Sequence, residues 1–128
     1  MTQVIHKHEW KRFFDTISRE RFGWETAVQV LDDDAGAQIM SEGLAFTGMT
    51  FEVHHDNAVL ELLIGRDAGN HQTHNIFDPK RVAYELNQTG PGGTLDIEDA
   101  EGTKTLINFY QPKPMMLEFK KGEMVAVG

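Results

Sequence analysis

The chain has 128 residues, with 20 acidic and 12 basic side chains, a formal net charge of −8 at pH 7 and no cysteine. This length fits one domain that buries about two-thirds of the surface of its unfolded chain, so we expect a single domain over residues 1–128, with residues 111–128 as an extension. The absence of cysteine excludes thiol catalysis, thiolate metal ligands and disulfide bonds. The negative charge makes nucleic acid and anionic membrane surfaces unfavourable partners.

The N-terminal region carries no targeting signal that the sequence reveals. Residues 1–22 contain charged side chains throughout, and the longest apolar patch, residues 59–64, is interrupted by Glu61. A membrane-spanning helix needs roughly 18 consecutive apolar residues. We therefore expect a cytoplasmic protein without a membrane partner.

Residues 7–22 have the pattern of an amphipathic helix. Their apolar residues recur at i, i+3, i+4 and i+7, and these are Trp10, Phe13, Phe14 and Ile17. Gly23 is suited to end the helix. This aromatic face could dock a partner, but such a face more often packs on the protein's own sheet. We interpret it as part of the core.

The middle of the chain reads as a series of strands. Apolar residues alternate over residues 24–31, 39–46, 49–55 and 59–64, and a further strand begins at His71. The second and third of these strands are interrupted near Thr47 and Gly48. Polar turns at residues 32–36 and 54–57 indicate antiparallel hairpins.

Residues 78–90 read as a second, shorter helix. Asp78 can cap a helix whose first position is Pro79, and Val82, Ala83 and Leu86 form a short apolar stripe. A glycine-rich turn at residues 90–93 ends this predicted helix.

A last hairpin follows the glycine-rich turn. Leu95 and Ile97 alternate with acidic residues, residues 99–102 form the turn, and Thr105, Ile107 and Phe109 alternate on the return strand.

These elements predict an α+β fold. In this fold the N-terminal amphipathic helix packs on a mainly antiparallel, strongly twisted sheet of six or seven strands, and a short helix precedes the last hairpin. The glycine-broken corners would permit closure of the sheet into a small barrel. Residues 115–119 either add a last strand or lie across the core.

Three sequence motifs resemble a known family. They are W-x-x-F-F at residues 10–14, H-x-I-x-x-P at residues 74–79 and L-x-I-x-D-x-x-G at residues 95–102. Over residues 8–110 the chain resembles a family of short bacterial proteins catalogued only as a domain of unknown function. The resemblance implies a bacterial cytosolic single domain, and it brings no known activity, cofactor or catalytic residue.

Histidine is the residue type that most suggests a site. His71 and His74 lie at i and i+3, so on a strand their rings would point to opposite faces, and His55 stands in a second cluster beside Asp56. One histidine from each cluster, with Asp56 or Asp67, could form a metal site in three dimensions. The more economical interpretation gives His74 a role in orienting the helix start or as a partly buried ring. We predict no metal and no cofactor, and take His55, His71 and His74 as the candidate ligand pocket.

The remaining motifs favour no chemistry. The aspartates at residues 32–34 are contiguous, whereas calcium loops space their ligands at alternate positions. The acidic residues between Asp96 and Glu101 lie on a solvated strand face and turn. The glycine-rich turn lacks the Lys-Ser/Thr of a phosphate loop, and neither serine lies in a Gly-x-Ser-x-Gly elbow. We predict no catalytic residue, and the sequence leaves enzyme activity open.

Three functional hypotheses follow. The first is a non-enzymatic binding or interaction protein that acts as a homo-oligomer or with a protein partner, supported by apolar residues in the C-terminal extension. The second is a small enzyme, or a ligand- or metal-binding protein, with a histidine-lined pocket. The third is a nucleic-acid-binding small barrel, which the net charge of −8 opposes unless the basic residues gather on one face.

Overall fold

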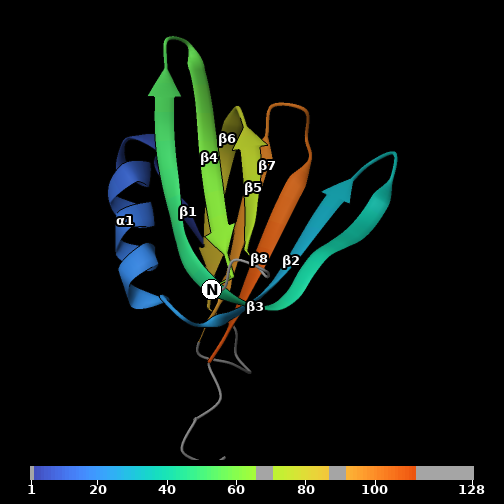
Figure 1. Ribbon diagram of the computed structural model, residues 1–128. Coiled ribbons are helices and arrows are strands. Elements are labelled where there is room, and N and C mark those ends of the chain that lie inside the picture. The colour runs from blue at the N-terminus through green and yellow to red at the C-terminus, as the bar shows by residue number, and fades with distance from the viewer. Residues whose placement is uncertain (1, 66–70, 87–91, 112–128) are drawn as a thin grey trace, which may run out of the picture.

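One antiparallel sheet and one α-helix make up the computed structural model, which describes residues 2–65, 71–86 and 92–111 (Figure 1). The helix α1 (Trp10–Glu20) follows a 3-10 turn, η1 (Lys7–Glu9). The strands are ordered β1-β6-β7-β8-β2-β3-β4-β5. Their bounds are β1 Thr2–Ile5, β2 Glu25–Asp32, β3 Gly36–His54, β4 Asn57–Ile64, β5 Gln72–Phe77, β6 Pro79–Glu85, β7 Thr94–Asp99 and β8 Lys104–Tyr110.

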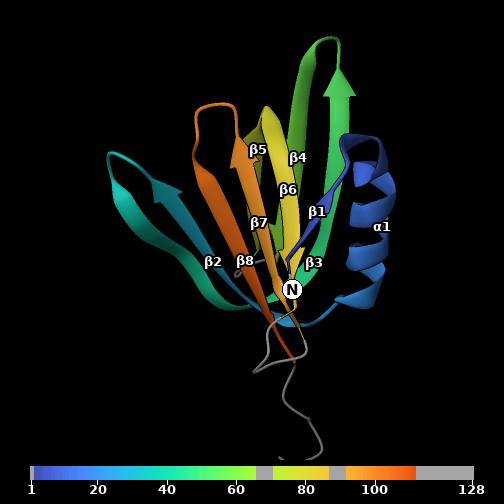
Figure 2. The same ribbon diagram turned by 180° about the vertical axis from the view of Figure 1, so that it is seen from behind.

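The predicted α+β class and the barrel are wrong. The described part is predominantly β-sheet with a single short α-helix, so strands rather than helices account for most of its structure. The sheet is open, because β1 and β5 each have one neighbouring strand among the described residues. Figure 2 shows β1 at its edge position beside β6.

Strand β3 divides the sheet into two arms. Its first half pairs with β2 and its second half, from Phe46 to His54, pairs with β4. We call β1, β6, β7, β8, β2 and the first half of β3 the large arm, and the second half of β3 with β4 and β5 the small arm. Register shifts in β3 occur at Met40, at Gly43, which has φ +82°, and again between Phe46 and Gly48. The predicted break near Thr47 and Gly48 is therefore an irregularity within one strand, because such bulges bend a strand without ending it.

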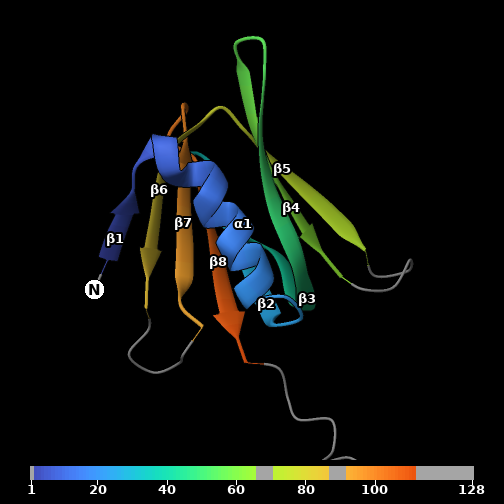
Figure 3. The same ribbon diagram turned by 90° about the vertical axis from the view of Figure 1, so that its left-hand side faces the viewer.

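Helix α1 fills the space between the two arms on one side of the molecule (Figure 3). Its buried face consists of Trp10, Phe14 and Ile17, as the helical periodicity predicts. The indole Nε1 of Trp10 donates a hydrogen bond to the Ile5 carbonyl at 2.9 Å. At the other end, the Ser18 hydroxyl accepts from the Met49 amide at 2.9 Å. Trp10 thus ties the helix to the large arm, and Ser18 ties it to the small arm.

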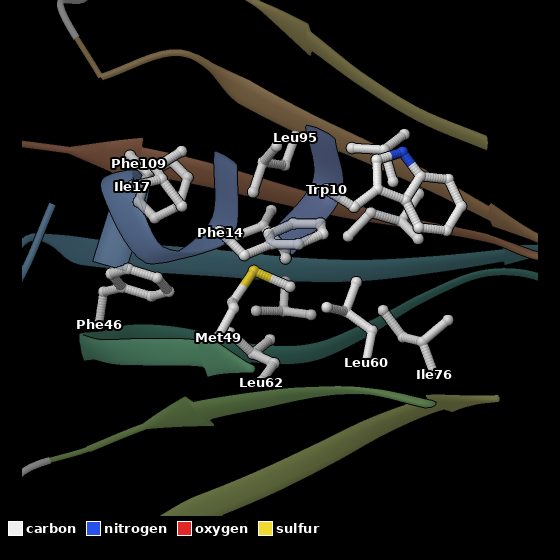
Figure 4. Close-up of a cluster of buried hydrophobic side chains, with 14 of the residues drawn as sticks. Trp10, Phe14, Ile17, Phe46, Met49, Leu60, Leu62, Ile76, Leu95 and Phe109 are labelled. Atoms are coloured by element: carbon white, nitrogen blue, oxygen red, sulfur yellow. The ribbon is translucent and has the colours of Figure 1, made fainter. Parts of the chain in front are cut away.

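The hydrophobic core lies between α1 and both arms. Figure 4 shows side chains from the helix meeting those of β3 and β4 in the small arm and of β7 and β8 in the large arm. Burying one large apolar side chain contributes about 1.5–3 kcal/mol, so the core holds the arms and the helix together. The fully or almost fully buried members include Trp10, Phe14, Phe46, Leu60, Leu62, Ile64, Val82, Leu95, Ile97, Ile107 and Phe109.

The predicted second helix is wrong, because residues 79–85 form strand β6. Asp78 has φ +55° and does not cap a helix. Pro79 opens the strand, where its missing N–H costs no ladder hydrogen bond. Val82 is buried against Ile97 of β7, and pairing with both β1 and β7 satisfies the backbone of β6. Non-local pairing therefore overrides the local signal of Asp-Pro.

The chain around Gly92 and Gly93 connects β6 to β7 rather than ending a helix. The Arg21 guanidinium donates to the Gly92 carbonyl at 3.2 Å and to the Tyr84 hydroxyl at 2.9 Å, and the Tyr84 hydroxyl donates to the same carbonyl at 2.7 Å. Gly93 has φ +81°, which favours glycine. These bonds fix the end of α1 against the large arm.

The predicted last hairpin is confirmed. β7 and β8 pair from Thr94 opposite Asn108 to Glu98 opposite Lys104, and Gly102 in the turn has φ +87°. The turns β2–β3, β3–β4 and β7–β8 point to one end of the molecule, opposite the N-terminus (Figure 1). Residues 115–119, for which the sequence predicts either a last strand or a segment across the core, lie outside the described residues, as do residues 112–128 as a whole.

Candidate functional site

A groove of about 350 Å³ lies between β5 of the small arm and the large arm. Its lining residues come from three separate segments of the chain. The alternating burial of β5, in which Ile76 is buried and His74 half-buried while their neighbours are exposed, turns these two side chains toward the large arm. The described lining residues are Val30, His74, Asn75, Ile76, Phe77, Asp78, Asp99, Ala100, Glu101, Thr103 and Thr105.

Both arms supply the apolar walls of the groove, and the large arm also supplies its polar rim. Val30 of β2 and the buried Thr105 of β8 are paired neighbours in the sheet, and Ile76 belongs to β5. The turn between β7 and β8 forms the rim. There one carboxylate oxygen of Asp99 accepts hydrogen bonds from the amides of Glu101 at 2.9 Å and Thr103 at 3.0 Å. The rim is therefore a preformed turn whose shape does not depend on a ligand.

The link between β5 and β6 closes one end of the groove. The Asp78 amide donates to the Ala58 carbonyl at 2.8 Å, and the Asp78 carbonyl accepts from the Ala100 amide at 3.0 Å. Asp78 thus joins the tip of the β7–β8 hairpin to the small arm. Its carboxylate forms an ion pair with Lys80 at 3.2 Å, and both side chains are more than half exposed, so this pair contributes little to stability.

His74 is a half-buried titratable group of the groove. Burial lowers the pKa of His74 from the ordinary value of 6.5, because the charged imidazolium loses solvation. The ring is therefore predominantly neutral at pH 7, with one nitrogen able to donate and the other able to accept a hydrogen bond. Threonine hydroxyls and carboxylates are its polar neighbours in the lining. The imidazole, hydroxyl and carboxylate groups of the lining can bind a ligand through hydrogen bonds and ionic interactions. The described lining contains no serine, cysteine or lysine that could act as a nucleophile.

The three histidines of the predicted pocket do not meet. His55 is exposed in the β3–β4 turn with φ +57°, and His71 is exposed just before β5. The ladder between β4 and β5 runs from Val59 opposite Phe77 to Ile64 opposite Gln72, so these two histidines lie at its opposite ends. At about 3.3 Å per residue, that separation exceeds metal-ligand reach several-fold. Of the three, His74 alone lines the groove.

The acidic residues that suggested metal ligands do not converge on a metal site where they are described. Asp32 accepts a hydrogen bond from the Asp34 amide at 2.7 Å and so stabilises its own turn. Asp96 lies on the outer face of β7, opposite Leu106. Among the described residues, no group of three or more His, Asp or Glu side chains is placed to hold a metal ion. Asp67 lies outside them.

Sequence reasoning missed most of the groove. The alternation in residues 72–77 could have placed His74 and Ile76 on one face, since the polar residues Thr73 and Asn75 occupy the other face. No local signal places Val30, Thr105 and the turn at residues 99–103 beside that face. Their proximity depends on the bend of β3 and on the link at Asp78.

The chain belongs to a family of unknown function, DUF5335, whose model matches residues 1–117. The predicted resemblance to a family of short bacterial proteins without known function is therefore confirmed, and the match extends beyond residues 8–110 at both ends. The chain is also similar to an uncharacterized protein of Aquifex aeolicus (strain VF5). The two are 25% identical over 114 residues, which cover 89% of this chain and 96% of that relative. No solved structure matches the chain.

In the part of the chain that the structure describes, no helix combines the length and apolar character that crossing a membrane requires.

Proposed function

We propose that this protein is a non-enzymatic binding domain and that its binding site is the groove between β5 and the β7–β8 hairpin. The observation that carries the proposal is the combination of an apolar wall, a preformed polar rim and a neutral imidazole in one concavity. Binding sites commonly combine an apolar surface with a few fixed polar groups. The rim also joins both arms through Asp78, so a ligand in the groove would contact both.

The composition of the chain supports a cellular location and a class of partner. Zero cysteines suit a cytoplasmic location, and the net charge of −8 disfavours nucleic acid and anionic membranes as partners. A nucleic-acid surface would need its cations on one face, whereas Arg21 is engaged with Tyr84 and Gly92. A protein partner fits the charge better, and either such a partner or a second copy of the chain can pair with the open edges that β1 and β5 present in the described part.

The test is a fragment screen by two-dimensional amide NMR on the full chain. Fragments should shift the amide signals of His74, Glu101 and Thr105 together. Ala100→Trp, which places a bulky ring on an exposed lining residue, should abolish those shifts, whereas Ala35→Trp in the exposed β2–β3 turn should leave them unchanged. Shifts that gather elsewhere, or that persist in Ala100→Trp, would contradict the groove as the binding site.

The alternative function is a small enzyme or metal-binding protein, and it is supported by His74 in the groove. Native mass spectrometry of the untagged protein, before and after chelator treatment, separates the two functions. Binding without a metal leaves the mass unchanged by the chelator, and a homo-oligomer gives a multiple of 14.5 kDa. A chelator-sensitive mass increase would favour the alternative.

A further inference from the structure

Strand β5 presents an unpaired backbone edge. It is the last strand of the sheet, and within residues 2–65, 71–86 and 92–111 no strand pairs with its outer side. The hydrogen bond from the Asp78 amide to the Ala58 carbonyl shows which residues of β5 direct their backbone N–H and C=O groups toward β4, because these groups alternate in direction along an antiparallel strand. The backbone groups of Gln72, His74 and Ile76 therefore face β4. Those of Thr73, Asn75 and Phe77 face outward, where they can accept another strand.

This free edge borders the groove. Asn75 and Phe77, whose backbone groups face outward, line the groove together with His74 and Ile76. A strand added to β5 would therefore run through the groove, and every second side chain would lie against the apolar wall formed by Val30 and Ile76. Backbone pairing at a sheet edge supplies affinity, and alternate side chains in pockets supply specificity.

The charge around this edge selects the partner. None of the described lining residues is Lys or Arg, whereas Asp78, Asp99 and Glu101 are acidic, although Asp78 is paired with Lys80 just outside the lining. Beyond Val30, strand β2 leads to the aspartates at residues 32–34, at the same end of the molecule as the β7–β8 turn (Figure 1). A second copy of the chain would bring like charges together, which costs several kcal/mol. A basic segment would be attracted.

The exposed ring of Phe77 adds a feature that suits a basic partner. Its side chain is 67% exposed at the end of β5, and it lines both this groove and a neighbouring cavity beside Asp56. Aromatic rings attract Lys and Arg cations and pack on their aliphatic stems. Phe77 thus offers an apolar face to such a side chain in the groove whose rim carries Asp99 and Glu101, whereas the adjacent Asp78 is already paired with Lys80.

We propose that β5 is a docking strand on which an extended, lysine- or arginine-rich segment of another protein adds to the sheet and lies in the groove. This inference rests on the proposed function and names its partner class. Backbone pairing with Thr73, Asn75 and Phe77 fixes the segment. The acidic rim selects it from other extended segments.

The test measures binding of a fluorescent hexapeptide of alternating lysine and valine to the full chain by anisotropy. A glutamate–valine peptide of the same length is the charge control. The lysine peptide should bind at least about tenfold more tightly than its control, and about 0.5 M salt should weaken it several-fold by screening. Equal binding of the two peptides would overturn the proposed charge selection.

Backbone pairing is tested by Asn75→Pro, which removes an outward N–H at an edge position where proline is tolerated. Asn75→Ala is the matched control, because it changes the side chain and keeps the N–H. The proline variant should lose about tenfold in affinity and the alanine variant less than about twofold. N-methylation of alternate peptide amides tests the same bond without altering the protein, and at least one of the two methylation registers should weaken binding as much as Asn75→Pro does.

The outcomes separate this inference from the function on which it rests. If fragments bind the groove but Asn75→Pro and both registers of N-methylated peptide leave peptide binding unchanged, strand addition is wrong and the binding function stands. If Ala100→Trp changes neither fragment nor peptide binding, both proposals fail. If the protein dimerises and Asn75→Pro abolishes the dimer, the occupant is a second copy and the basic partner is wrong.

Discussion

At the scale of single residues, the burial of His74 in the groove makes the stability of the fold depend on pH. Burial lowers the pKa of His74 below 6.5, so the unfolded chain binds a proton more readily than the folded protein. Stability therefore rises with pH in this window. The part of the free energy of unfolding that depends on neutral His74 is present above pH 6.5 and is lost as the pH falls below this value and through the lowered pKa of His74.

We predict that His74→Gln removes this part of the pH dependence. The free energy of unfolding, measured by urea denaturation between about pH 7.5 and pH 5.5, should fall in the wild type and fall less in the variant. His71→Gln is the matched control, because His71 is exposed at the start of the same strand. If the free energy of unfolding fell with pH as steeply in His74→Gln as in the wild type, His74 would not be the group that causes this pH dependence.

Gly92 is a second position where one residue decides the packing. A Cβ atom built on Gly92 would lie 2.0 Å from the Phe109 carbonyl oxygen, and this oxygen belongs to the backbone of β8. Gly92→Ala must therefore displace the β6–β7 connection, and we expect a loss of about 3 kcal/mol or more in the free energy of unfolding.

The matched control for Gly92 is Gly48→Ala. A Cβ atom at Gly48 would meet the Ser18 hydroxyl at 3.4 Å, which is an ordinary contact. This change should alter the free energy of unfolding by less than about 1 kcal/mol. Thermal and urea denaturation of both variants check the difference. Similar losses at the two positions would contradict the packing seen around Phe109.

At the scale of elements, α1 stabilises the fold through one face. Phe14 is fully buried between the arms, whereas Phe22, just beyond the helix, is 62% exposed. Phe14→Ala should cost about 3–5 kcal/mol, because it removes apolar burial and leaves a cavity. Phe22→Ala should change the free energy of unfolding by less than about 0.5 kcal/mol. Comparable losses in the two variants, measured by urea denaturation, would show that the helix does not pack as described.

The helices and strands also show which sequence patterns are sufficient to predict secondary structure. Leu95 and Ile97 alternate with acidic residues before an Asp-to-Gly turn, and Thr105, Ile107 and Phe109 recur at every second position after it. This local pattern correctly predicts the β7–β8 hairpin. Asp78-Pro79 suits both a helix start and a strand start, and the few apolar residues that follow do not distinguish the two periods. Pairing with β1 and β7 decides in favour of a strand. Strand β1 itself escapes prediction, because it is four residues long and buries only Ile5.

At the scale of the whole molecule, the curvature of the sheet creates the groove. The bend of β3 brings the small arm over the large arm, and the Asp78 link holds β5 near the β7–β8 turn. Sequence patterns report which face of a strand is buried, but they do not report how far a sheet curls. The sequence predicts that His74 either orients a helix start, which the structure replaces by strand β6, or packs as a partly buried ring, and it groups His74 with two histidines that lie elsewhere.

The single-domain organisation expected for residues 1–128 makes a prediction at the same scale. The indole of Trp10 bonds to Ile5 of the large arm and packs edge-on against Phe51 of the small arm, with ring centroids 5.3 Å apart. One core therefore serves both arms, and we predict that they unfold in one cooperative transition. In a Trp24→Phe background, Trp10 fluorescence reports on the junction of the arms, and far-UV circular dichroism reports on the whole sheet.

The two signals should give the same urea midpoint and the same slope, about 1–3 kcal/mol per molar urea. Phe51→Leu, which loosens the contact of Trp10 with the small arm, should lower both midpoints equally, because a weakened junction destabilises one cooperative unit. If the small arm were a separate unit, fluorescence would change at lower urea than circular dichroism, and Phe51→Leu would widen that gap. Because β5 carries the proposed docking edge, a coincident transition would also mean that a bound strand stabilises the entire fold rather than one arm.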